Sequence, residues 1–86
     1  MISKEVLIKN ESGLHAYPAS QLVELCKKYK SNITICTDEM ELDGKSIISI
    51  LLGCIYKGTS IKILVDGEDE EEALQAIIEL INNLEG

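Results

Sequence analysis

Apolar and polar residues alternate in four short stretches of the chain, and a period of two is typical of strands with one buried face. The predicted strands cover residues 2–8, 33–37, 39–43 and 61–65. In the first strand Lys4 interrupts the apolar phase and Leu7 falls on the polar side. The second and third strands are separated by a turn at Asp38 and Glu39, so we expect them to form a hairpin.

Apolar residues at spacings of three and four predict three helices, which start near residues 16, 46 and 69. The first carries this spacing from Pro18 to about Tyr29, and a proline suits the first turn because its missing N–H would have no partner there. The second covers Ile47–Leu52, with Ser46 as its N-cap, and ends before a glycine. The third begins with the acidic run 68–72, which suits the positive end of a helix dipole and which we interpret as structural.

The resulting order of elements, β-α-β-β-α-β-α, predicts an α+β domain in which helices cover one face of a four-stranded sheet. A chain of 86 residues is long enough for one small core and too short for two, so we expect a single domain over residues 1–86. The pattern does not fix the order of the strands. It also leaves two interpretations of the apolar run 47–52, which is either ordinary core or a docking patch that faces solvent.

Charge and composition exclude several classes of binding partner. Eight basic and fifteen acidic residues give a formal net charge of -7, which opposes binding to nucleic acid or to an anionic membrane and favours protein partners. The sequence shows no targeting segment and no apolar run near the ~20 residues that span a bilayer, so we expect a cytoplasmic protein without membrane insertion. Cys26, Cys36 and Cys54 form no C-x-x-C pair and are interpreted as buried thiols, and no cofactor or metal is predicted.

The candidate chemistry lies at the only histidine, His15, which comes three residues before the only proline, Pro18. A helix N-terminus presents unpaired N–H groups and the positive end of a dipole, and both favour an anion. An imidazole at this position can carry a phosphoryl group that these donors stabilise. The alternative is a histidine that only caps the helix of a small protein-interaction or metal-handling domain, although no second strong metal ligand accompanies His15 in its motif.

Two motifs resemble the HPr family, the histidine-containing phosphocarriers of the bacterial sugar phosphotransferase system. Residues 13–19, Gly-Leu-His-Ala-Tyr-Pro-Ala, resemble the active-site motif of this family, and Lys45-Ser46-Ile47 followed by Gly53 resembles its regulatory-serine segment. The resemblance runs from about residue 2 to about residue 84. It implies an open-faced β-sandwich whose antiparallel sheet has the order 1-4-2-3, with three helices on one face and His15 at one end.

The resemblance also implies a carrier rather than a turnover enzyme. His15 would accept a phosphoryl group from Enzyme I through its Nδ1 atom and pass it to the IIA components of sugar permeases, with Ala16, Tyr17 and Pro18 forming the phosphoryl environment. Ser46 would be phosphorylated by HPr kinase/phosphorylase, an enzyme typical of Gram-positive-like bacteria, and a catabolite-control transcription factor would be a further partner. We expect a monomer. The residues expected to bind partners are Ser20, Glu24, Lys27, Ile47, Ile48 and Leu51.

One residue departs from the family pattern. The family has arginine where this chain has Tyr17, and a guanidinium can hold a phosphate in a fork that a phenol cannot reproduce. We therefore expect weaker recognition of the phosphoryl group. The alternative function is that of a regulatory HPr-like paralogue, which acts mainly through Ser46 and protein binding and has weak carrier activity.

Overall fold

Seven elements follow one another in the order β-α-β-β-α-β-α in the computed structural model, which describes residues 1–85. The strands are β1 (Ile2–Leu7), β2 (Asn32–Cys36), β3 (Glu41–Asp43) and β4 (Ser60–Asp66), and the helices are α1 (Ala16–Cys26), α2 (Ile47–Leu52) and α3 (Glu70–Asn82). The predicted order of elements is confirmed, and position 86 of the predicted domain lies outside the described residues.

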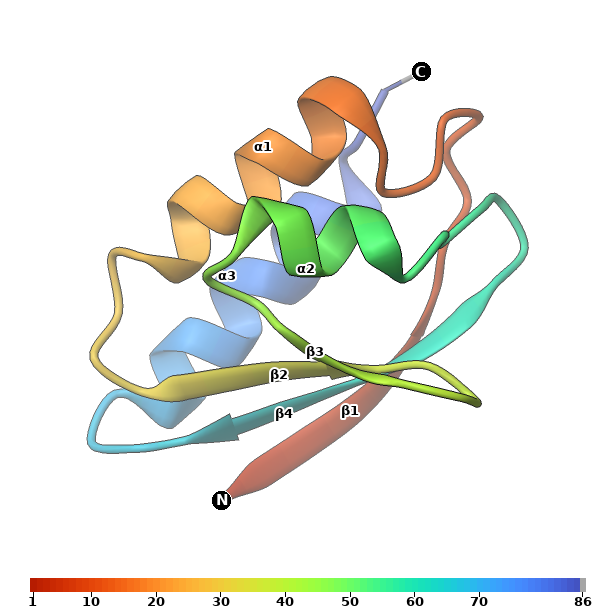
Figure 1. Cartoon of the computed structure of the whole chain (residues 1–86). Helices are drawn as coiled ribbons and strands as arrows, with labels where there is room; N and C mark the ends of the chain where they lie inside the picture. The colour runs from red at the N-terminus through yellow and green to blue at the C-terminus, as the bar shows by residue number, and fades with distance from the viewer. Residues whose placement is uncertain (86) are drawn as a thin grey trace.

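All four strands lie in one antiparallel sheet of the order β1-β4-β2-β3, as the family resemblance implied. The central strand β4 pairs Ile61 with Val6 of β1 and Ile63 with Ile35 of β2. The three helices lie together on one face of the sheet, and the other face is left open (Figure 1). The predicted α+β open-faced sandwich is therefore confirmed.

The face of the sheet under the helices is built from aliphatic side chains because the chain contains no phenylalanine or tryptophan. Burial of each such side chain contributes about 1.5–3 kcal/mol to stability. Five sheet positions of the predicted strands are buried: Val6, Ile33, Ile35, Ile61 and Ile63. Leu7 is exposed, as its position in the alternation indicated. Lys4 is exposed although it lies in the apolar phase, so the buried face of β1 is incomplete.

Helix α1 ends at Cys26, earlier than the predicted end near Tyr29. The N–H groups of Lys28 and Tyr29 donate to carbonyls three residues back, at 3.1 and 3.2 Å, and hydrogen bonds of this span tighten the chain beyond a helix end. The partly buried Tyr29 packs against the core, and its carbonyl accepts a hydrogen bond from Lys45 Nζ at 2.8 Å. Lys27, Lys28 and Lys30 therefore follow the helix and do not form its last turn.

Strand β3 covers Glu41–Asp43 and not 39–43, because Thr37 closes the preceding turn over Met40. The Thr37 N–H donates to the Met40 carbonyl at 2.8 Å, and the Met40 N–H donates to Thr37 Oγ1 at 3.0 Å. Glu39 and Met40 thus belong to the turn. The predicted hairpin of the two strands is confirmed.

The prediction of three buried thiols is wrong for two of them. Cys26, the last residue of α1, is buried, whereas Cys36 is half-buried and Cys54 is exposed. Cys36 alternates with the buried Ile35 in β2, so its side chain lies on the open face of the sheet. Cys54 follows α2 in the left-handed backbone conformation, with φ at +50°.

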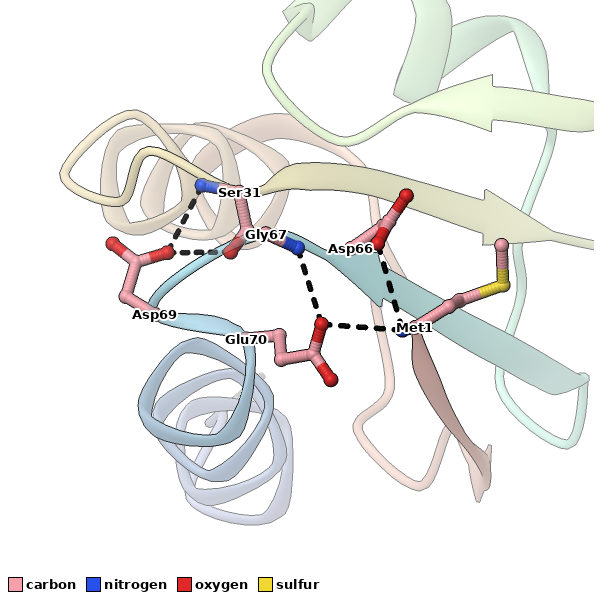
Figure 2. Close-up of polar contacts among 6 residues, drawn as sticks. All are labelled: Met1, Ser31, Asp66, Gly67, Asp69 and Glu70. Atoms are coloured by element: carbon pink, nitrogen blue, oxygen red, sulfur yellow. Dashed lines mark hydrogen bonds and ion pairs between the residues drawn. The ribbon is translucent and has the colours of Figure 1, made fainter.

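The acidic run at the start of α3 has a structural role, as predicted. Asp69 accepts hydrogen bonds from the hydroxyl of Ser31 and from its N–H at 3.0 Å (Figure 2). Glu70 Oε1 accepts a hydrogen bond from the Gly67 N–H and lies 3.2 Å from the amine of Met1. The hydrogen bond from Ser31 is the main cause that lowers the pKa of Asp69, and the bond from Gly67 does the same for the pKa of Glu70.

Candidate functional site

His15 occupies the N-cap position of α1, at the end of a loop that its sequence shapes. The loop turns at Gly13, whose φ of +61° lies in the left-handed region open to glycine. Asn10 closes the turn, because its side-chain amide donates to the Gly13 carbonyl at 2.8 Å and its main-chain carbonyl accepts from the Gly13 N–H at 3.1 Å. The turn over residues 10–13 thus delivers His15 to the helix.

The same loop is fastened to the residues that follow α2. The Leu14 N–H donates to the Ile55 carbonyl at 2.9 Å. A Cβ atom on Gly13 would lie 2.2 Å from this carbonyl oxygen and 2.8 Å from the Cα of Tyr56, so no other residue fits at position 13 without moving one segment. The chain before α1 and the chain after α2 are therefore held together backbone to backbone.

The imidazole of His15 is half-buried and forms no hydrogen bond that caps the helix. Its Nε2 atom is closed off from solvent and has no hydrogen-bond partner within residues 1–85. The ring lies beside that of Tyr56, with the centroids 5.1 Å apart and the planes inclined at 37°. The two ring nitrogens therefore differ, since Nε2 alone is among the buried atoms without a partner.

The first turn of α1 offers N–H groups beside this imidazole. Ala16 and Tyr17 each carry an N–H, and groups at these positions have no partner within a helix. Pro18 carries none, so its buried ring leaves no unpaired donor behind. Ala16 has a φ of +50°, a left-handed conformation that costs a residue other than glycine about 1–2 kcal/mol. The backbone is therefore strained directly beside His15.

Helix α2 presents apolar side chains to solvent. Among its six residues only Ile50 is buried, whereas Ile47, Ile48 and Leu51 are 38%, 68% and 39% exposed and Leu52 is 63% exposed. We call these four exposed residues the α2 patch. Grouped apolar side chains of this kind are typical of interaction surfaces. The predicted exposure is confirmed, and the alternative that the whole run is ordinary core is wrong.

The other three predicted partner-binding residues lie on α1 or directly after it, and α1 packs next to α2 (Figure 1). Ser20, Glu24 and Lys27 are all exposed. The Nζ of Lys27 lies 4.0 Å from a carboxylate oxygen of Glu24, an exposed ion pair that stabilises little. The structure thus places five of the six residues on two neighbouring helices and Lys27 directly after α1.

Ser46 is the N-cap of α2, as predicted, and its hydroxyl accepts a hydrogen bond from the Ser49 N–H at 3.3 Å. The Ser49 hydroxyl in turn accepts from the Asp43 N–H at 2.8 Å, which joins the helix start to the end of β3. The neighbouring Lys45 reaches the end of α1 through its bond to Tyr29. The half-buried Ser46 therefore lies where α1, β3 and α2 are joined.

A family model described as the phosphorylation site of the HPr component of the phosphotransferase system matches residues 2–83. The chain belongs to the HPr family. It is 40% identical over 83 residues to phosphocarrier protein HPr of Xylella fastidiosa, which covers 96% of this chain and 93% of that protein. A crystal structure of an HPr from Thermoanaerobacter tengcongensis is similar with a TM-score of 0.93 at 36% identity and covers 95% of this chain and 92% of that one. The solution structure of Crh, the catabolite repression HPr of Bacillus subtilis, is similar with a TM-score of 0.71 at 25% identity and covers 96% and 99%.

Within this HPr-family fold, Tyr17 is the residue that stands where the family pattern has arginine. Its side chain is 71% exposed and borders shallow grooves that it shares with Gln21 of α1 and Leu80 of α3. The sequence contains eight lysines and no arginine. A fork of guanidinium N–H groups for a phosphoryl group on His15 is therefore absent from the sequence as a whole.

Sequence reasoning missed Tyr56 beside the imidazole of this HPr-family chain. The residue follows α2 by four positions in a loop, where no periodic pattern applies. Its contact with His15 depends on the pairing of two segments that are far apart in the chain, so no local signal could have identified it. The exposure of Leu52 was also missed. A helix of six residues has too few positions for its apolar spacing to show which side faces solvent.

Metal ligands do not cluster in the part of this HPr-family chain that the structure describes. Within residues 1–85 no group of three or more histidine, cysteine, aspartate and glutamate residues is placed to hold a metal ion. Burial raises the pKa of the Cys26 thiol to about 12, so it remains a protonated core residue. No helix among the described residues is long and apolar enough to cross a membrane.

Proposed function

We propose that His15 accepts a phosphoryl group from phosphorylated Enzyme I and passes it to the IIA components of sugar permeases. The observation that carries this proposal is the state of the imidazole. It is the only imidazole in the chain, it stands at the start of α1 without a hydrogen bond to the helix, and its Nε2 atom is closed off. A histidine that served only as a cap would use a ring nitrogen for the helix.

The chemistry needs few groups from this chain. The Nδ1 lone pair attacks phosphorus while the bond from phosphorus to the donor breaks, and Nε2 keeps its proton throughout. The N–H groups of Ala16 and Tyr17 and the positive end of α1 stabilise the phosphoryl oxygens, and Pro18 fixes the first turn. Transfer to the next protein is the same step in reverse, so His15 acts as a carrier.

The partners would dock on the exposed side chains of α1 and α2. Ile47, Ile48 and Leu51 offer apolar contact area, and Ser20, Glu24 and Lys27 offer polar contacts at its side. A surface with an apolar centre and a polar margin can be shared by several partners one after another. Enzyme I and the IIA components would therefore compete for it.

We further propose that HPr kinase/phosphorylase phosphorylates Ser46 and that this modification weakens docking of Enzyme I. A phosphate adds about -1.5 to -2 charges at pH 7. At Ser46 this charge would lie at the start of the α2 patch, where docking requires apolar groups to lose their water. The phosphoserine form would be the one that a catabolite-control transcription factor binds.

The second candidate function is that of a regulatory paralogue with weak carrier activity, and Tyr17 is the observation that favours it. Without arginine at this position the phosphoryl group loses a charged partner. The fold similarity extends to Crh, which is named a catabolite repression HPr. In this case Ser46 would be labelled by the kinase, while His15 would exchange its phosphoryl group slowly.

The experiment that tests the carrier function is incubation with phosphoenolpyruvate and Enzyme I. We expect one acid-labile phosphoryl group per chain, its complete loss in His15→Ala, and unchanged labelling in Met40→Ala, a matched control in the β2–β3 turn. Subsequent addition of a IIA domain should remove the label. Equal labelling of His15→Ala would reject the assignment, and labelling by the kinase alone would favour the paralogue.

A further inference from the structure

Tyr56 lies beside the reactive imidazole although neither family motif contains it. Its ring centroid is 5.1 Å from that of His15, in a tilted arrangement typical of favourable aromatic pairs. The side chain is otherwise 59% exposed, so it is not part of the hydrophobic core. A large aromatic side chain that is mostly open to solvent and touches the only histidine requires an explanation other than packing.

The backbone that carries the Tyr56 ring is held by its own turn. The Tyr56 N–H donates to Thr59 Oγ1 at 3.3 Å, and its carbonyl accepts from the Thr59 N–H at 3.0 Å. This turn is anchored to the segment after β1, because the Gly58 N–H donates to the Ile8 carbonyl at 2.7 Å. Together with the contact of Gly13 with Tyr56, these bonds fix the relative positions of the two backbones that carry the rings.

No hydrogen bond among the described residues holds the His15 ring in its orientation. The imidazole has no capping hydrogen bond, and Nε2 has no partner among the described residues. A ring held by hydrogen bonds would keep its orientation without a neighbour, but this ring has only packing to restrict rotation about its Cβ–Cγ bond. Tyr56 is the aromatic neighbour that supplies such packing.

We propose that Tyr56 is a positioning residue that restricts phosphorylation of His15 to Nδ1 by holding the Nε2 side of the ring inside. The proposal rests on the proposed function in that His15 carries the phosphoryl group. Nε2 is the less crowded nitrogen of a free histidine side chain, since it is one bond further from the backbone. A ring that turned freely would therefore also react at Nε2, and its phosphoryl group would then point away from the N–H groups of Ala16 and Tyr17.

The test uses potassium phosphoramidate, a small phosphoryl donor that reacts with imidazole without Enzyme I. In the reaction an Nδ1 or Nε2 lone pair forms a bond to phosphorus, and the P–N bond of the donor breaks with loss of ammonia. The proteins compared are the wild type, Tyr56→Ala and Tyr56→Phe. The two phosphohistidine isomers are quantified by ³¹P and ¹H–¹⁵N NMR, and amide spectra report whether each variant is folded.

We expect the wild type and Tyr56→Phe to form the Nδ1 isomer, because the contact involves the ring and not the hydroxyl. In Tyr56→Ala the ratio of Nε2 to Nδ1 product should rise by about 2- to 10-fold, the factor that corresponds to the ordinary strength of an aromatic pair. If the alanine variant is unfolded, Tyr56→Leu provides the same comparison. A change in stability alone would not move this ratio.

Nδ1 product alone in a folded Tyr56→Ala, or Nε2 product in the wild type, would overturn the proposal. Absence of labelling in the wild type would also overturn it, because Nδ1 would then be inaccessible. Since phosphoramidate needs no protein donor, a failure with Enzyme I would reject the carrier function and leave this result standing. The two proposals can therefore fail separately.

Discussion

The hydroxyl of Ser31 donates a hydrogen bond to Asp69, a residue 38 positions further along the chain. The same carboxylate accepts from the Ser31 N–H, so one side chain joins the start of β2 to the start of α3 (Figure 2). These bonds favour the charged carboxylate and hold the pKa of Asp69 below its ordinary value.

We expect Asp69→Asn to destabilise the fold in a pH-dependent way. Because the folded-state pKa is lowered, the stabilisation is present above the unfolded pKa of about 3.8 and is lost as the pH falls through the lower folded pKa. Urea denaturation from pH 7 to pH 2 should therefore show a difference between wild type and variant that shrinks on acidification. Glu68→Gln, an exposed carboxylate in the same run, is the control. An equal difference at pH 7 and pH 2 would contradict the role of the charge.

Alanine substitution of two isoleucines of α2 should have different effects, one on stability and the other on partner binding. Ile50 is completely buried, so Ile50→Ala should lose about 2–5 kcal/mol of unfolding free energy. Ile48 is 68% exposed, so Ile48→Ala should change stability by less than about 0.5 kcal/mol and should weaken binding of Enzyme I. Chemical denaturation and calorimetric titration measure the two effects. Wild-type affinity in Ile48→Ala would exclude Ile48 from the docking surface.

Tyr17→Arg should accelerate phosphoryl transfer from Enzyme I. A charge-assisted hydrogen bond contributes roughly 1.5–3 kcal/mol, which is about a ten- to a hundredfold change in rate if it is fully expressed in the transition state. Residue 17 is largely exposed, so water should reduce the gain toward the lower end. Stopped-flow transfer measures the rate. Tyr17→Lys is the control, because lysine supplies the positive charge without the paired N–H groups of a guanidinium. No gain with arginine would show that the missing cation does not limit this chain.

Ser46→Asp and Ser46→Ala should separate capping from regulation. Aspartate retains an N-cap acceptor, whereas alanine should lose about 0.5–2 kcal/mol of stability. If charge at Ser46 inhibits docking, the aspartate variant should bind Enzyme I more weakly than the alanine variant, and the difference should shrink at high salt. Equal affinities at both salt concentrations, with no labelling by the kinase, would leave Ser46 as a cap only.

Cys54→Gly should stabilise the protein. Cys54 has a φ of +50°, where a side chain costs about 1–2 kcal/mol, and glycine relieves this cost but loses about 0.5–1 kcal/mol of backbone entropy. The expected net gain is about 0.5–1 kcal/mol, measured as a higher denaturation midpoint. Cys54→Ser removes the same thiol without relieving the backbone and should show no gain. An equal gain in both variants would assign the effect to the thiol.

Local patterns predicted those parts of the fold that depend only on residues close together in the sequence. Alternation placed Val6 and Ile63 on the buried face and Leu7 on the other. Helix α2 was predicted with its observed bounds, because a capping serine and a following glycine both mark a short helix. The location of His15 at a helix start followed in the same way from Pro18.

The remaining features depend on partners distant in sequence or on backbone conformations that a residue type does not reveal. The strand order came from the family resemblance, since pairing of Val6 with Ile61 leaves no local signal. The left-handed residue after α2 is Cys54 and not the glycine before it, and Ala16 adopts the same unusual conformation beside His15. The ring of Tyr56 lies beside that of His15 because two loops pair through their backbones, which no periodic pattern encodes.

The pairing of β1 with β4 determines when the sheet can be completed during synthesis. β1 leaves the ribosome first, yet its pairing partner is β4, the last strand to be made. Until residue 66 has emerged, the hairpin of β2 and β3 is the only strand pair that can form completely, and β1 remains unpaired. The loop that carries His15 also remains unattached until residue 55 has emerged, because the Leu14 N–H donates to the carbonyl of Ile55. A nascent chain thus contains all of residues 13–19 long before the loop that carries them can form its anchoring hydrogen bond.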